Sequence, residues 1–79
     1  MYEFPIEVKK IIKKVLAVET KRLGGEPEFS MTDGLIANFS KPESVRGMSQ
    51  ALYCLRIISK KERNLLRDES VKCAKCPEN

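Results

Sequence analysis

The sequence contains no histidine and no tryptophan, and it lacks the residue patterns on which most enzymes depend. Without histidine the most frequent general base is absent, and neither a Ser-His-Asp nor a Cys-His arrangement can be built. No glycine-rich phosphate-binding loop is present either. A chain of 79 residues also has little room for an enclosed substrate pocket. We therefore expect a protein that is not an enzyme.

Long apolar runs are missing as well. No segment approaches the roughly 18 consecutive apolar residues of a membrane-spanning helix. The first residues, MYEFPIEVKK, contain charges and a proline where a signal peptide needs an apolar centre. Cysteine is scarce, with three residues, and nothing directs the chain to an oxidising compartment. The sequence thus predicts a cytoplasmic protein with reduced thiols and no membrane partner.

What the chain does contain is an excess of positive charge. Lysine and arginine number 15 against 11 acidic residues, which gives a formal net charge of +4. This charge permits binding to nucleic acid or to an acidic protein, and it also simply keeps a small domain in solution. Apolar residues make up 42% of the chain, enough for one core. We expect a single small domain over residues 1–72 and a flexible C-terminal tail over residues 73–79.

Residues 5–23 form the clearest element. Apolar residues recur there at helical spacing along one face, and Pro5 suits a first helical turn. Gly24-Gly25 predicts the end of this helix, because glycine adopts the left-handed conformation without strain. The opposite face of the helix carries Lys9, Lys10, Lys13, Lys14 and Lys21. Such a face can bind phosphates or an acidic protein surface, although a solvated face is the more common explanation of a charge run.

Residues 28–39 allow two interpretations. Asp33-Gly34 is a favourable two-residue turn, which indicates a short β-hairpin. The other interpretation is a short helix from about Thr32 to Phe39, which Gly34 would weaken by up to about 1 kcal/mol relative to alanine. We favour the hairpin slightly because of the Asp-Gly pair.

Two capping boxes follow, SKPE at residues 40–43 and SKKE at residues 59–62, and each predicts the start of a helix. The first helix, over residues 40–58, has an apolar stripe of Val45, Met48, Leu52 and Leu55, widened by Ala51 and Ile58. The second has a narrower apolar stripe of Leu65, Leu66 and Val71, so the two helices should form a helical hairpin. The expected fold is therefore mainly α: a small helical domain with a basic amphipathic N-terminal helix, a possible short β-hairpin at 28–39 and a C-terminal helical hairpin.

A helix, turn and helix over residues 32–58 would also outline a DNA-binding unit. The exposed side of its second helix would carry Arg46, Gln50, Tyr53 and Arg56. Arginine can contact guanine and glutamine can contact adenine in the major groove. The connection SKPE is shorter than this unit usually has, and the first helix disappears if residues 28–39 form a hairpin. A DNA-binding transcriptional regulator is therefore an alternative function.

The tail contains a second candidate site, Cys73-Ala74-Lys75-Cys76. Two thiolates at this spacing make half of a tetrahedral zinc site. One chain cannot complete a site of four cysteines or of mixed cysteine and histidine, but a homodimer could supply one pair from each copy. The simpler interpretation is a mobile tail with two free thiols. A zinc-bridged homodimer through Cys73 and Cys76 is a minor alternative, and otherwise no cofactor is expected.

The function that we favour is a non-enzymatic small binding protein, such as an adaptor, inhibitor or regulator, that docks onto another protein through a basic helical surface. The expected contact residues belong to two helices. They are Lys9, Lys10, Lys13, Lys14, Lys21, Arg46, Gln50, Tyr53 and Arg56. Tyrosine and arginine are among the residues that most often contribute interface energy.

Overall fold

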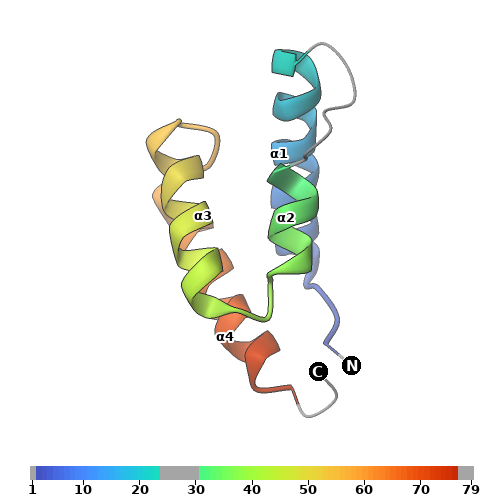
Figure 1. Ribbon diagram of the computed structural model, residues 1–79, viewed down its shortest axis with the longest axis vertical. Helices are drawn as coiled ribbons and strands as arrows, with labels where there is room; N and C mark the ends of the chain where they lie inside the picture. The colour runs from blue at the N-terminus through green and yellow to red at the C-terminus, as the bar shows by residue number, and fades with distance from the viewer. Residues whose placement is uncertain (1, 24–30, 77–79) are drawn as a thin grey trace.

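The computed structural model describes residues 2–23 and 31–76. This part of the chain folds into α1 (Ile6–Leu23), α2 (Met31–Ala37), α3 (Pro42–Cys54) and α4 (Lys60–Ala74). Helix α2 packs against α1, and α3 packs along α4, while α1 also contacts α4 (Figure 1). The molecule measures 39 × 25 × 22 Å. The prediction of a small helical domain with a C-terminal helical hairpin is confirmed.

Helix α1 begins directly after Pro5. The Lys9 backbone N–H donates to the Pro5 carbonyl at 3.0 Å, so the proline stands at the point where the helical bonds begin. The helix buries Val8, Ile11 and Val15 of its predicted apolar face, whereas Leu16 of that face is 48% exposed. It ends at Leu23. Gly24-Gly25, which we expected to end it, lies outside the described residues.

Helix α2 corrects the preference for a β-hairpin, because residues 31–39 contain no strand. A seven-residue helix that includes Gly34 is too short to be stable alone. The Glu19 carboxylate of α1 stabilises its first turn by accepting hydrogen bonds from the backbone N–H of Met31 and from the Thr32 hydroxyl. This long-range cap favours the helix over the Asp-Gly turn. The start of the expected hairpin, residues 28–30, lies outside the described part of the chain.

The start of α3 is the second correction. Ser40 does not cap it: the N-cap is Lys41, and no side chain makes a capping bond. The reason is that residues 38–40 continue from α2 as a turn, in which the Lys41 N–H donates to the Asn38 carbonyl at 2.9 Å. This turn is fixed to α4 by the buried Ser70 hydroxyl, which donates to the Phe39 carbonyl at 2.7 Å.

The end of α3 is the third correction, since the helix stops at Cys54 and not at residue 58. Arg56 adopts a left-handed conformation with φ of 60°. The Ile57 N–H then donates to the Leu52 carbonyl at 3.0 Å, and the Arg56 N–H donates to the Tyr53 carbonyl at 2.9 Å. These two bonds form a Schellman motif, which ends the helix.

This early end changes which apolar side chains are buried. Leu55, expected on the core stripe, is 49% exposed, and Ala51 is exposed too. Ile58 is buried because the chain turns back toward the core, and Ile57 packs partly against the core. The stripe of α3 therefore consists of Val45 and Leu52, with Met48 partly buried.

Helix α4 confirms the second capping box. The Ser59 hydroxyl accepts from the Glu62 N–H at 3.1 Å, and the Glu62 carboxylate accepts from the Ser59 N–H at 2.8 Å. The helix continues through Ala74, and Cys73 is only 7% exposed. Cys73, the first residue of the expected tail, belongs to α4 and packs into the core. Residues 77–79 lie outside the described residues.

One apolar core joins all four helices. Its members are Val8, Ile11, Val15, Leu35, Phe39, Val45, Leu52, Ile58, Leu66 and Cys73. The segment before α1 covers one end of this core, since the rings of Tyr2 and Phe4 both lie close to the Phe39 ring, at 5.9 and 4.9 Å between centroids. Burial and a hydrogen bond to Glu69 raise the pKa of Tyr2.

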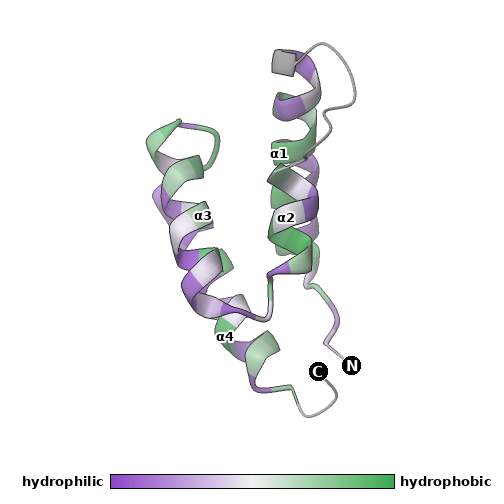
Figure 2. Cartoon of the chain, in the orientation of Figure 1, coloured by the Kyte–Doolittle hydropathy of each residue, from purple (hydrophilic) through white to green (hydrophobic). Residues whose placement is uncertain are grey.

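The helices are amphipathic, with hydrophobic and hydrophilic residues alternating along them (Figure 2). Within residues 2–23 and 31–76, no helix combines the length and the apolar character that crossing a membrane requires.

Candidate binding surfaces

The predicted basic face of α1 is exposed, as are all five of its lysines. Helix α1 contains these lysines and Arg22 against Glu7 and Glu19. Six positive and two negative charges give α1 a net charge of +4, which equals the net charge of the whole chain. The excess positive charge of the protein is therefore located on one helix.

Four of the five lysines form a surface that we call the α1 lysine face, namely Lys9, Lys10, Lys13 and Lys21. None of them makes an ion pair with a residue in the described part of the chain. Lys9 and Lys13 stand four residues apart, and Lys10 and Lys13 three apart, so like charges are neighbours on the helix surface. Lys9, Lys10 and Lys13 therefore form one region of uncompensated positive charge, and Lys21 lies about two helical turns beyond Lys13.

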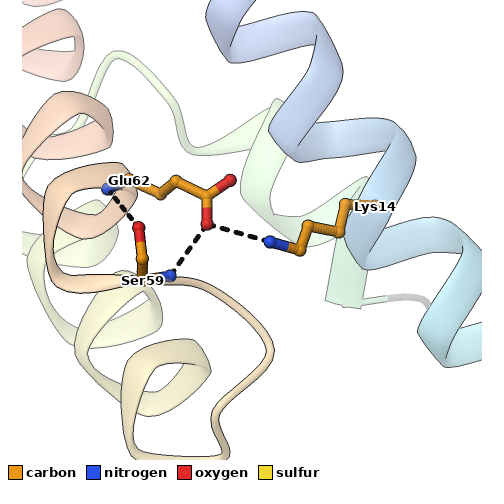
Figure 3. Close-up of polar contacts among 3 residues, drawn as sticks. All are labelled: Lys14, Ser59 and Glu62. Atoms are coloured by element: carbon orange, nitrogen blue, oxygen red, sulfur yellow. Dashed lines mark hydrogen bonds and ion pairs between the residues drawn. The ribbon is translucent and has the colours of Figure 1, made fainter.

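Lys14 is different, because it holds α1 against the start of α4 (Figure 3). Its ammonium group lies 3.0 Å from Oε1 of Glu62, and the same oxygen accepts from the Ser59 N–H. Burial alone would raise the pKa of Glu62, but the bond from the Ser59 N–H and the contact with Lys14 lower it below its ordinary value. Lys14 is therefore a structural residue and not part of the free basic surface.

The predicted contact residues of α3 contact α4 to different extents. Gln50 accepts a hydrogen bond from Arg63 at 3.0 Å, and the Arg63 guanidinium lies 4.8 Å from the centre of the half-buried Tyr53 ring. Arg46 is exposed and makes no ion pair with any described residue. Arg56 belongs to the turn after α3.

Two arginines of α4 were missed by the sequence analysis. Arg63 binds Gln50 and Tyr53, and Arg67 lies beside Arg46 in a groove between α3 and α4. Their spacing of four residues could have shown that they share a side of α4. Nothing in the sequence indicates that this side faces α3.

The proposed DNA-binding unit needs α2 and α3 to pack together, with α3 presented to the groove. In the structure α2 packs against α1 and α3 packs along α4 (Figure 1). Gln50 and Tyr53, which were to contact bases, instead contact Arg63.

The two tail cysteines are not presented together. Cys73 belongs to the core, while Cys76 is half-buried after the end of α4. Among the described residues, no three side chains of cysteine, aspartate or glutamate are grouped so that they could hold a metal ion. The zinc-bridged dimer stays a prediction, and it would require Cys73 to leave the core.

Shallow grooves are the concave features of the surface. One, of about 250 Å³, lies between α1 and α4 and has Ile11 and Leu65 among charged neighbours. A second, of about 460 Å³, lies between α3 and α4 and has Arg46 and Arg67 in its lining. Both suit contact with another molecule's surface better than enclosure of a substrate.

Comparisons with family models, with curated proteins and with solved structures find no match for this chain. A functional conclusion therefore depends on the surfaces described above.

Proposed function

We propose that this chain is a non-enzymatic binding protein that docks onto an acidic surface of another protein through the α1 lysine face. The observation that carries the proposal is the set of four exposed lysines without ion-pair partners. Adjacent like charges at helical spacing destabilise a helix by about 0.2–0.5 kcal/mol per pair. The fold gains nothing from this arrangement, whereas an acidic partner would turn the repulsion into attraction.

Two further observations support a protein partner over DNA. Gln50 and Tyr53 are engaged with Arg63, so they are not free to contact base edges. No aromatic residue stands among the lysines of α1, so stacking on single-stranded bases is not supported. The cytoplasm is the compartment that we propose, because the exposed thiol of Cys54 suits a reducing environment.

The test compares two variants with the same change in charge. Lys9→Glu with Lys13→Glu reverses the centre of the α1 lysine face. The control, Lys41→Glu with Lys60→Glu, changes two exposed lysines at the starts of α3 and α4, where negative charge is favourable. Each tagged protein is used to isolate partners from the native host, and the partner is then purified and titrated.

We expect the α1 variant to bind the purified partner at least about tenfold more weakly, with unchanged helical circular dichroism, and the control to bind like wild type. Equal binding by both variants would overturn the assignment. In parallel, duplex DNA is titrated at low and moderate salt. Tight DNA binding that falls steeply with salt, and that the α1 variant abolishes, would replace a protein partner by nucleic acid.

A further inference from the structure

A groove with charged side chains in its lining runs between α3 and α4 and is separate from the α1 lysine face. Glu43, Arg46 and Arg67 line both its main part, of about 460 Å³, and an adjoining part of about 230 Å³. Because the two parts share these three residues, they form one continuous depression, which we call the arginine groove. Gly47 and Gln50 complete the first part, and Pro42 and Val71 complete the second.

Gly47 keeps this groove open. It stands in the middle of α3, where glycine weakens a helix by up to about 1 kcal/mol relative to alanine. A Cβ atom at this position would meet no other atom within 4 Å, so no neighbouring side chain requires glycine here. Because Gly47 has no side chain, it leaves space in the part of the groove that Arg46 and Arg67 line.

The two arginines of the groove come from different helices, and neither makes an ion pair with a described residue. Arg63, one turn before Arg67, is by contrast held by Gln50 and by the ring of Tyr53. Arg63 therefore has partners for its guanidinium, whereas the guanidinium groups of Arg46 and Arg67 have no ion-pair partner among the described residues. Both stay charged at every physiological pH. A guanidinium binds a carboxylate through two parallel hydrogen bonds.

We propose that the arginine groove binds a short acidic peptide segment of a partner protein, with a side-chain carboxylate between Arg46 and Arg67. The adjoining part of the groove supplies Pro42 and the 40% exposed Val71, which fit an aliphatic side chain next to that carboxylate. With Glu43 beside Arg46 and Arg67, the groove has a net charge of +1, which suits one carboxylate better than a polyphosphate. Glu43 can also accept a hydrogen bond from a peptide N–H group.

This site goes beyond the proposed function, because it lies on another side of α4. Glu62 and Leu65 of α4 face α1, where they line a different groove with Ile11. Arg67 faces α3. A partner could occupy one surface without touching the other, so the two sites can be tested independently.

The probe is an acetylated and amidated hexapeptide in which two glutamates flank a leucine, and its match has glutamines in place of the glutamates. Binding is followed by NMR through the side-chain Nε–Hε signals of Arg46 and Arg67, up to millimolar peptide. We expect these two signals to shift with the acidic peptide. The affinity for the glutamine peptide should be at least about tenfold lower.

Three variants accompany the titration. Arg46→Gln with Arg67→Gln removes both charges, and Gly47→Leu fills the groove while favouring the helix. Arg56→Gln is the matched control, an exposed arginine outside the groove. We expect the first two to weaken binding at least about tenfold, and Arg56→Gln and the double lysine variant of α1 to leave it unchanged.

The proposal is overturned if neither arginine signal shifts at millimolar peptide, or if the acidic peptide and the glutamine peptide bind with equal affinity. It is also overturned if inorganic phosphate or duplex DNA binds at Arg46 and Arg67 more tightly than the acidic peptide, since the ligand would then be a phosphate. If the double variant Lys9→Glu with Lys13→Glu is the only one that loses binding, the peptide binds to the α1 lysine face instead.

Discussion

The Glu62 carboxylate holds two groups in place at the start of α4. It accepts from the Ser59 N–H and pairs with Lys14 of α1, while the backbone N–H of Glu62 donates to the Ser59 hydroxyl (Figure 3). The sequence predicts the local half of this arrangement, because a capping box joins residues three apart. The contact with Lys14, 48 residues away, could not be predicted in this way.

Removing the cap at Ser59 tests the local contribution. Ser59→Ala should lower the free energy of unfolding by about 1 kcal/mol, because the Glu62 N–H loses its acceptor. The matched control is Ser40→Ala, since Ser40 was expected to cap α3 but no side chain does so. Urea denaturation of both variants measures the difference. Equal losses would contradict the structure at both helix starts.

Replacing Glu62 by glutamine tests the charge. Because the pKa of folded Glu62 is lowered, its contribution is present above the unfolded value of about 4.3 and is lost as pH falls through the folded pKa. Wild type should therefore be more stable than Glu62→Gln near neutral pH, and the difference should shrink as the pH falls below the unfolded pKa. Denaturation at several pH values measures it, with Glu3→Gln at an exposed site as control. A difference independent of pH would contradict this explanation.

At the scale of elements, α2 shows how a distant residue decides local structure. The sequence allowed a hairpin and a short helix at residues 28–39, and the Asp-Gly pair favoured the wrong one. What stabilises the helix is Glu19, which caps Met31 and Thr32 from the neighbouring helix. No pattern within a window of ten residues contains this information.

The end of α3 shows the same limit. The apolar spacing predicted a helix through Ile58, but the chain adopts a Schellman motif around Arg56. The motif usually has glycine in the left-handed position, so an arginine there gave no signal in the sequence. The motif permits Ile57 and Ile58 to approach the core, which offsets the strain at Arg56.

Glycine substitution distinguishes the left-handed backbone of Arg56, after α3, from the helical backbone of Arg46 within it. Arg56→Gly should raise the free energy of unfolding by up to about 1 kcal/mol, because a left-handed conformation strains any residue with a Cβ atom. Arg46→Gly, the same change inside α3, should lower it by about 1 kcal/mol. Thermal and urea denaturation provide the comparison. Destabilisation by both changes to a similar extent would show that Arg56 lies in a helix.

At the scale of the whole molecule, one core connects four helices, and burial is decided by which side chains reach it. Leu52 and Leu55 were expected on the same stripe of α3. In the structure Leu52 is fully buried and Leu55 is 49% exposed. The positive charge of the molecule is concentrated on the outer side of α1, where it does not meet this core.

A pair of leucine substitutions tests this arrangement. Leu52→Ala should lower the free energy of unfolding by about 2–5 kcal/mol, because it removes buried contacts and leaves a cavity. Leu55→Ala should change it by less than about 0.5 kcal/mol, as expected for an exposed side chain. Denaturation curves for the two proteins measure the difference. A large loss with Leu55→Ala would contradict the early end of α3.

The sequence by itself determined the helical class of this protein, the capped start of α4 and the basic outer face of α1. These features depend on residues three or four apart, whose periodicity and capping bonds are visible in any short window. Only the tertiary structure decided that residues 31–37 are helical, that α3 ends at Cys54, and that Arg67 lies beside Arg46 in a groove. The reason is physical: these outcomes depend on contacts between residues far apart in the chain, such as Ser70 with the Phe39 carbonyl, 31 residues away.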